Sequence, residues 1–301
     1  MKTKALKMPR PGPKACRAPN RSFVCGKYAL PCGSRTRIMG ILNVTPDSFS
    51  DGGLYFGEAA RALERIVRMA ADGADVIDVG GESTRPGSIG IAADEELKRV
   101  IPVIREAAAA VGVPISVDTS KSEVAREALR SGASIVNDVT GLRGDRRLAS
   151  VVADHGAGVI LMHMRGTPRT MQENPSYTDV VAEVIADLRS SIDAALAAGI
   201  ARERIVVDPG IGFGKTLDHN LEILRRLGEL RCLGRPIMVG VSRKSFLGTI
   251  LDKGVGERLT GTLAASATAI MNGADFLRAH DTRETVEAAR VVDAIMGKGR
   301  A

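Results

Sequence analysis

Short apolar runs alternate with longer amphipathic stretches along the chain from residue 38 to the end. The apolar runs have the length of buried strands. In the stretches between them, apolar residues recur at every third and fourth position, which is the period of a helix packed on a core. Several of these stretches end at glycine, as helices often do. The pattern predicts eight strands, at 38–43, 75–80, 114–118, 134–138, 157–163, 204–208, 236–241 and 274–280.

Eight strand and helix units in this order predict an α/β protein with a (β/α)8 TIM barrel. The alternative is an open doubly wound sheet, because the number of strands does not prove closure. We expect the barrel to span 38–297, after a basic N-terminal extension over 1–37 that is flexible at its start and enters a short hairpin near 23–30. Residues 298–301 would form a C-terminal tail. With 44% hydrophobic residues and no tryptophan, the core is expected to consist of Ala, Val, Ile and Leu.

The predicted strands end in polar residues. In a parallel barrel the carboxyl ends of all strands face one rim, where ligands bind and catalytic groups collect. The sequence therefore predicts a polar site at the mouth of the barrel. The strand ends are Asn43, the Gly-Gly-Glu segment at 80–82, Asp118, Asn137 with Asp138, His163, Asp208, Ser242 and the Arg-Ala-His segment at 278–280.

Helix capping is the alternative explanation for each of these residues taken singly. Asp118 precedes TSKSEVA and Ser242 precedes RKSFLG, so either side chain is a candidate cap for the helix that follows. Capping does not account for the whole set, because it requires neither two basic residues at the last strand nor a histidine between two methionines at 162–164.

Three kinds of side chain are expected at this rim. Basic groups suit a phosphate or diphosphate, and arginine suits it best because its fork matches phosphate oxygens. Carboxylates and amides suit a flat heterocycle with several N–H groups and a carbonyl, and apolar side chains suit its faces. The basic group comprises Arg85, Lys244, Arg278 and His280; the acceptor group Asp118, Asn137 and Asp208; and the apolar group Met162, Met164 and Phe213.

The net charge of +7 is concentrated at the N-terminus. Residues 1–37 contain ten Lys or Arg and no acidic residue, which leaves 42 − 10 = 32 basic against 35 acidic residues in the rest, or about −3. We therefore expect no nucleic-acid partner; an organellar targeting role for the basic segment is the alternative. No apolar run is long enough to cross a membrane, and the four cysteines match no zinc or redox spacing. The sequence predicts a cytoplasmic protein.

Several cofactor motifs are absent from the sequence. There is no GxGxxG at the first strand, no GxxxxGK[ST] and no HExxH. The glycine-rich GIGFGK at 210–215 is weak evidence alone. If a metal takes part, we expect Mg²⁺ held by Asn43 and substrate phosphate oxygens, because this ion keeps several waters and uses few protein ligands.

Eight segments occur in the order found in the dihydropteroate synthases, and the chain resembles that family over 38–297. In the last segment a β-branched residue is more common at Ala279, but the two basic positions beside it match. The segments are NVTPDSFSDGG at 43–53, DVGGESTRPG at 78–87, SVDTSK at 116–121, ND at 137–138, LMHM at 161–164, DPGIGFGKT at 208–216, SRKSFLG at 242–248 and RAHD at 278–281.

The resemblance implies an enzyme that joins 6-hydroxymethyl-7,8-dihydropterin diphosphate to para-aminobenzoate, with Mg²⁺ as cofactor and a homodimer as the assembly. Asp118, Asp208, Lys244 and Asp47 would be its catalytic residues. Asp47 and Phe49 would lie on a mobile loop. The other implied roles are Asn137, Met162 and Phe213 with Asp118, Asp208 and Lys244 around the pterin; Asn43, Arg85, Arg278 and His280 around the diphosphate and metal; and Thr84 and Ser242 near the aminobenzoate.

The expected mechanism is a dissociative substitution. As the bond to diphosphate breaks, the leaving group gains negative charge and the pterin methylene becomes cationic, so fixed charges of both signs stabilise the transition state. Two rivals remain. A methyltetrahydrofolate methyltransferase would not need the ESTRPG, SRK and RAHD segments. A non-catalytic pterin-binding paralogue would be favoured by loss of Arg85, Lys244 or His280, all of which are present.

Overall fold

The computed structural model describes residues 21–44, 55–84 and 87–299. Across these ranges, eight parallel strands form one sheet in the order β8-β7-β6-β5-β4-β3-β10-β9. A parallel bridge between Val207 and Ile237, in which Val207 N donates to Pro236 O at 3.0 Å, joins the two ends of this order. The predicted barrel is therefore confirmed and the open sheet is wrong. The strands are β3 Arg37–Asn43, β4 Val76–Gly80, β5 Ile115–Asp118, β6 Ile135–Asp138, β7 Gly158–Met162, β8 Ile205–Asp208, β9 Met238–Val239 and β10 Phe276–Ala279.

Strand β9 is much shorter than the predicted 236–241. Pro236 has no N–H to donate to a strand ladder, and Gly240 adds no side chain that packs on the sheet. The carbonyl oxygen of Ile237 instead accepts from two backbone N–H groups at the start of β10, those of Asp275 at 2.8 Å and Phe276 at 3.0 Å. The segment thus keeps its place in the barrel with few ladder hydrogen bonds.

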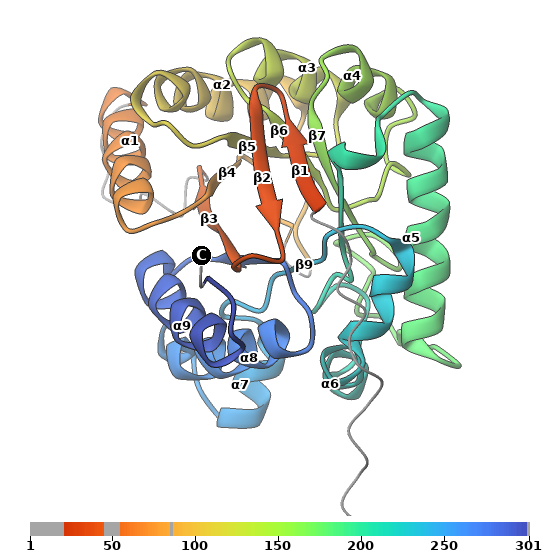
Figure 1. Ribbon diagram of the computed structural model, residues 1–301. Coiled ribbons are helices and arrows are strands. Elements are labelled where there is room, and N and C mark those ends of the chain that lie inside the picture. Colours follow the sequence, from red (N-terminus) through yellow and green to blue (C-terminus); the bar gives the residue numbers. More distant parts are fainter. Residues whose placement is uncertain (1–20, 45–54, 85–86, 300–301) are drawn as a thin grey trace, which may run out of the picture.

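Helices surround the strands (Figure 1). Their N-termini are set by local chemistry in two cases: Asp179 accepts hydrogen bonds from Val181 N and Ala182 N, and Thr216 forms a capping box with His219. The helices are α1 Tyr55–Ala71, α2 Ala93–Ala110, α3 Ser122–Arg130, α4 Leu148–Asp154, α5 Val180–Ala197, α6 Leu217–Arg225, α7 Ser245–Leu251, α8 Leu259–Met271 and α9 Thr282–Ile295, with short 3-10 helices at Arg202–Arg204, Leu227–Leu233 and Val255–Glu257.

The core between strands and helices consists almost entirely of Ala, Val, Ile and Leu, as the composition predicts. A second cluster lies at the other end of the barrel, where the predicted hairpin is found as β1 Arg21–Cys25 and β2 Tyr28–Cys32 (Figure 1). Phe23 is fully buried, and its ring meets that of Phe276 edge to face at 5.9 Å. The hairpin therefore covers the amino ends of the strands and leaves the carboxyl ends for the site.

In the described ranges, no helix has both the length and the apolar content that a membrane span requires.

Candidate active site

The strand register brings Asn43, Asp118 and Asn137 into one row. Asn43 is aligned with Gly80 on β4, Gly80 with Asp118 on β5, and Asp118 with Asn137 on β6. A Cβ atom at Gly80 would lie 3.4 Å from Asp118 Cβ and 3.8 Å from Asn43 Oδ1. Gly80 therefore leaves open the space between the two polar side chains.

Arg278 crosses the mouth of the barrel from β10 to two carboxylates. Its Nη2 lies 2.7 Å from Asp118 Oδ2, and its Nε lies 2.6 Å from Asp78 Oδ2. Asn137 Nδ2 also donates to Asp78 Oδ2, at 2.9 Å. Asp78, to which the sequence analysis gave no role, thus joins Arg278 to Asn137, and Arg278 joins both to Asp118. Its signal was available: it is a carboxylate inside the apolar run VIDVG.

Helix capping does not explain Asp118 or Ser242. Helix α3 begins at Ser122 with Lys121 at its N-cap, and α7 begins at Ser245 with Lys244 at its N-cap; neither N-cap side chain makes a capping bond. Asp118 binds Arg278 instead. Ser242 Oγ lies 3.0 Å from His280 Nδ1 and accepts from His280 N at 3.2 Å.

Two carboxylate oxygens at the mouth are buried and have no hydrogen-bond partner in the described part of the chain, Asp78 Oδ1 and Asp118 Oδ1. Unpaired buried acceptors are costly unless a ligand satisfies them. Burial raises the pKa of Asp118 to about 7; Arg278 opposes this rise, and the carboxylates of Asp78, Glu96 and Asp138 add to it. The arrangement favours a ligand that presents N–H groups.

Asp208 at the end of β8 provides a further buried carboxylate. It is 4% exposed, and its Oδ1 accepts from Gly210 N at 2.7 Å. Burial raises the pKa of Asp208 to about 6, although the Gly210 N–H and the charges of Lys244, Arg278 and Lys215 act in the opposite direction. Asp208 is aligned with Met162 on β7, which places this carboxylate beside the apolar wall of the mouth.

That wall is a buried cluster of Val139, Met162, Met164, Met171 and Phe213. The ammonium of Lys244 lies 4.1 Å from the centre of the Phe213 ring, within the range of a cation–π contact. Burial and then the charge of Arg278 lower the pKa of Lys244 to about 8. The wall and the cation together form a slot for a flat, polar-edged ring.

His280 is neutral in this arrangement. Burial and then the nearby Arg278 lower its pKa to about 3, so at neutral pH it is an uncharged hydrogen-bonding group. Thr84 lies half-buried in the loop after β4. Arg85, Asp47 and Phe49 lie outside the described residues.

His163 faces away from the mouth. Its side chain is fully buried, with Nε2 3.0 Å from Asp187 Oδ2 on α5 and Nδ1 2.9 Å from Lys215 Nζ. Lys215 is the second residue to which the sequence analysis gave no role, and it ends the GIGFGK segment that was rated as weak evidence. His163 and Lys215 therefore contact each other beneath the loop 210–214, whose carbonyls Gly210 O and Phe213 O accept from Lys215 Nζ.

No group of three or more His, Cys, Asp or Glu that could hold a metal ion occurs among the described residues. The donor chemistry still fits Mg²⁺, because the amide oxygen of Asn43 is a hard ligand beside the open space at Gly80, and this ion takes its other ligands from water and phosphate.

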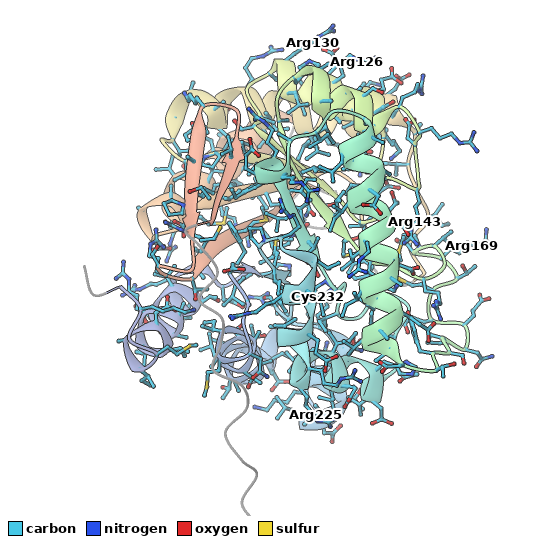
Figure 2. All side chains as sticks on the ribbon, turned by 45° about the vertical axis from the view of Figure 1, so that its right-hand side comes forward. Arg126, Arg130, Arg143, Arg169, Arg225 and Cys232 are labelled. Carbon is cyan, nitrogen blue, oxygen red and sulfur yellow. The ribbon has the colours of Figure 1, made fainter. Side chains whose placement is uncertain are left out.

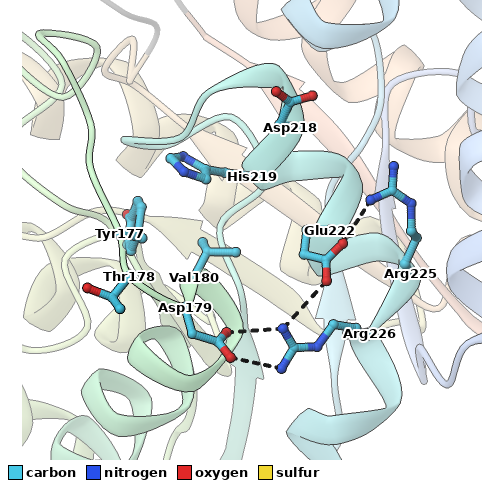
Figure 3. Close-up of a pocket in the computed structure, with 9 residues that line it drawn as sticks. All are labelled: Tyr177, Thr178, Asp179, Val180, Asp218, His219, Glu222, Arg225 and Arg226. Atoms are coloured by element: carbon cyan, nitrogen blue, oxygen red, sulfur yellow. Dashed lines mark hydrogen bonds and ion pairs between the residues drawn. The ribbon is translucent and has the colours of Figure 1, made fainter.

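A separate hollow lies between α5 and α6 (Figure 3). Arg226 binds Asp179 and Glu222 there, and Arg225 binds Glu222, so these charges are already paired. On the surface, Figure 2 shows Arg143 and Arg169, from the loops after β6 and β7, toward the same side, and Cys232 exposed. The mouth, with its unpaired acceptors, is the better candidate for a site.

Comparison with known proteins agrees with this geometry. The family model described as pterin binding enzyme matches residues 39–280. The chain is 50% identical to the dihydropteroate synthase of Escherichia coli (strain K12) over 263 residues, which cover 87% of this chain and 93% of that protein. It is 45% identical to that of Synechocystis sp. (strain ATCC 27184 / PCC 6803 / Kazusa) over 271 residues, 90% of this chain and 93% of that protein.

Solved structures agree as well. A Clostridium difficile dihydropteroate synthase crystallised with pteroic acid has a TM-score of 0.83 at 47% identity and covers 88% of this chain and 98% of its own. The Xanthomonas albilineans dihydropteroate synthase with 4-aminobenzoic acid has a TM-score of 0.86 at 43% identity, and the match covers 92% of this chain and 98% of that one. Identity at this level over nearly the whole barrel means that the chain belongs to the pterin-binding enzyme family, as a dihydropteroate synthase.

Proposed function

We propose that this chain joins 6-hydroxymethyl-7,8-dihydropterin diphosphate to para-aminobenzoate, which gives 7,8-dihydropteroate and diphosphate. The observation that carries the proposal is the pair of unpaired carboxylate oxygens, on Asp78 and Asp118, beside Arg278 in one buried mouth. A pterin has N–H groups along one edge that suit such acceptors. The pteroic acid and 4-aminobenzoic acid in the related structures support the choice of substrates.

The pterin ring is assigned to the slot between the polar and apolar walls. Its N–H edge would face Asp208, Asp118 and Asn137, and its carbonyl oxygen would accept from Lys244. Its flat faces would lie against Met162 and Phe213, which the strand end and the glycine-rich loop bring into the same cluster. An analogue without the N–H edge would leave buried acceptors unpaired and bind poorly.

Charge separation explains the remaining groups. The carbon–oxygen bond between the pterin methylene and diphosphate breaks, and its electron pair leaves with diphosphate. The amine lone pair of para-aminobenzoate then forms the new carbon–nitrogen bond, and one amine proton passes to solvent. Asp118 and Asp208, which Arg278 and Gly210 N hold in place, stabilise the cationic methylene, while Arg278 faces the departing anion.

Mg²⁺ belongs to this proposal as the partner of the diphosphate. Asn43 would hold it together with phosphate oxygens, and when bound the ion would neutralise part of the leaving group's charge. Thr84, Arg85 and Ser242 are assigned to the aminobenzoate and diphosphate, and Asp47 to the cationic methylene, on the family resemblance.

The test is mass spectrometry of the products after purified protein is mixed with Mg²⁺, the dihydropterin diphosphate and para-aminobenzoate, with diphosphate release followed in parallel. We expect dihydropteroate and diphosphate in equal amounts, and only when both substrates are present. Pterin binding without turnover would point to a non-catalytic paralogue. Methyl transfer from methyltetrahydrofolate would point to the related methyltransferases.

We also propose a homodimer formed through α8 and α9. Large apolar side chains are exposed on this helix pair: Met271 is 63% exposed on α8, and Val291 and Ile295 are 61% and 77% exposed on α9. Exposed apolar groups gathered on adjoining elements mark an association surface. Light scattering should give a dimer mass for the wild type and a monomer mass for Ile295→Glu. A matched change at Val67, 46% exposed on α1, should leave the dimer intact.

We place the reaction in the cytoplasm, because a diphosphate ester does not cross a bilayer unaided and is therefore used where it is made. Activity recovered from pelleted membranes, and absent from the supernatant, would contradict this placement.

A further inference from the structure

Lys215 is a buried lysine whose hydrogen-bonding capacity is fully used. It is 2% exposed, and its Nζ lies 3.0 Å from Gly210 O, 2.9 Å from Phe213 O and 2.9 Å from His163 Nδ1. An ammonium has three donors, so these three acceptors satisfy it, with His163 O as a fourth, longer contact at 3.5 Å. Within the described ranges it forms no ion pair. Two of its acceptors are carbonyls of the loop 210–214 that precedes it.

The third acceptor continues into a chain of hydrogen bonds. The carboxylate of Asp187 can only accept, so the ring proton of His163 lies on Nε2, which donates to Asp187 Oδ2 at 3.0 Å, and Nδ1 accepts from Lys215 Nζ at 2.9 Å. Asp187 is on α5, with its side chain 40% exposed. Lys215 is therefore hydrogen-bonded to His163, the residue that follows β7, and through His163 it is linked to α5.

The loop 210–214 needs such bracing, because three of its five residues are glycines with no side chain to hold the backbone. Gly210, Gly212 and Gly214 have φ values of +69°, +83° and +65°, a conformation that favours glycine. Its other two glycine carbonyls are also held from outside: Gln172 Nε2 donates to Gly212 O, and Tyr177 Oη donates to Gly214 O, each at 2.8 Å. Lys215 is the only one of these donors that is itself buried among the described residues.

The same loop carries two parts of the candidate site. Phe213 forms the apolar wall and lies 4.1 Å from Lys244 Nζ, and Gly210 N donates to Asp208 Oδ1 at 2.7 Å. Any drift of the loop carbonyls away from the ammonium would move both groups. The ammonium thus acts at a distance from the mouth, through the backbone.

We infer that Lys215 is a positioning residue for the pterin pocket, which fixes the loop 210–214 so that Phe213 forms one wall of the slot. The inference rests on the proposed function, since it takes the ligand of that slot to be the dihydropterin diphosphate. Lys215 does not touch this ligand, and its effect passes through Phe213.

The experiment compares Lys215→Met with the wild type in steady-state kinetics. Methionine keeps the buried aliphatic stem and removes the three donors. We expect the KM for the dihydropterin diphosphate to rise about 10-fold and the KM for para-aminobenzoate to change less than about 2-fold, because only uniform binding of one substrate is weakened. Lys98→Met, the same change at an exposed position of α2, is the control and should alter neither constant.

A double-mutant cycle separates positioning from a general structural role. If Lys215 acts through Phe213, then Lys215→Met in a Phe213→Leu background should raise the KM for the pterin substrate by less than about 2-fold, since residues in one network couple strongly. Equal factors in both backgrounds would overturn the inference, as would a folded Lys215→Met with unchanged KM for the pterin substrate.

If Lys215→Met does not fold, Asp187→Ala decides the question from the exposed end of the chain. It removes the acceptor that fixes the His163 tautomer and should raise the KM for the pterin substrate about 2–3-fold, which corresponds to one weakened hydrogen bond. An unchanged KM would overturn the inference. Failure of the proposed function is distinguishable, because the wild type would then make no dihydropteroate.

Discussion

Asp118 is a buried carboxylate to which the proposed mechanism assigns a negative charge that stabilises the transition state. Replacing it with asparagine removes the charge and keeps the shape, and Arg278 keeps its second partner, Asp78. We expect Asp118→Asn to fold and to lose about 3 kcal/mol of transition-state stabilisation, about a hundredfold in kcat, the size seen when one preorganised electrostatic contact is removed. Steady-state turnover measures this, with Asp154→Asn at an exposed position of α4 as control. Turnover near that of the wild type would contradict the dissociative scheme.

Ionised Asp208 should lower the stability of the folded protein at pH values above about 4, with the full cost reached near pH 6. Its pKa is about 6 when folded, compared with about 4 in an unfolded chain. Because the folded value is raised, the unfavourable term is absent below pH 4, grows between pH 4 and pH 6, and stays at about 2–3 kcal/mol at higher pH. Asp208→Asn keeps the acceptor for Gly210 N. It should therefore be more stable than the wild type at pH 8 and equal to it at pH 4, in urea unfolding of the protein without substrates.

The same variant should be nearly inactive at pH 8. Stability and turnover would then move in opposite directions, as expected where a charged group is buried for function. A variant that lost both stability and turnover at pH 8 would mean that the carboxylate of Asp208 is favourably solvated by its neighbours.

At the residue scale, the sequence predicted which polar residues lie at the strand ends better than it predicted which side chains bond to one another. Asp118, Asn137 and Arg278 follow from the rule that strand ends share a rim, and the structure brings them together. Asp78 and Lys215 were not assigned roles, because their partners are brought near by strand register and loop path, neither of which appears in a linear pattern. Their signal was a charged residue inside an apolar or glycine-rich segment.

The loop after β8 depends on glycine for two separable reasons. A Cβ atom at Gly210 would lie 1.9 Å from the carbonyl oxygen of His163, and its φ of +69° is also unfavourable for other residues. Gly234 has a φ of +65° but nothing within 4 Å of such a Cβ. Gly234→Ala should cost about 1 kcal/mol in unfolding free energy, the conformational term alone.

Gly210→Ala should cost considerably more and reduce pterin binding, because the loop has to move away from β7. Urea unfolding and calorimetric titration with a pterin ligand measure the two effects. Equal losses of unfolding free energy in Gly210→Ala and Gly234→Ala would show that the His163 carbonyl moves aside at no cost.

The hairpin β1–β2 contributes stability at the end of the barrel opposite the site. Phe23 is fully buried among the amino ends of the strands, and Gly158 has no room for a side chain there, since its Cβ would lie 2.5 Å from Phe23 Cζ. Phe23→Ala should lower the free energy of unfolding by about 3–5 kcal/mol, as large core truncations do. Turnover at low temperature should stay near that of the wild type. Leu30→Ala, at a half-buried position, should cost less.

At the element scale, periodicity predicted every barrel strand and the hairpin, with ends that differ by a residue or two. The exception is β9, where a proline and a glycine interrupt the ladder, although the apolar run is continuous. The number of strands favoured a closed barrel but did not establish closure, which depends on one bridge between Val207 and Ile237. Apolar patterning reports burial, and only hydrogen-bond geometry decides which buried segments are paired strands.

For the whole molecule, the net charge of +7 is not the net charge of the barrel, because the N-terminal segment holds most of the excess basic residues. The first 20 residues contain six basic residues and no acidic one, so their removal takes the formal net charge from +7 to 7 − 6 = +1. If this segment is responsible for any attraction to nucleic acid, that attraction should be weak and should decrease steeply with salt. The body itself should show none.

Two truncations test this division. Removal of residues 1–20 should leave turnover and melting temperature unchanged and abolish any retention on a DNA column at low salt. Removal of residues 1–32 also deletes the hairpin and exposes the apolar side chains of Met39, Val76 and Phe276. It should lower the melting temperature by about 10 °C or more, because 1 kcal/mol of unfolding free energy corresponds to about 3 °C in a protein of this size. Retention on DNA that survived the shorter truncation would assign the interaction to the barrel and contradict the charge argument. An unchanged melting temperature without residues 1–32 would mean that the apolar side chains at the amino ends of the strands do not need the hairpin to cover them.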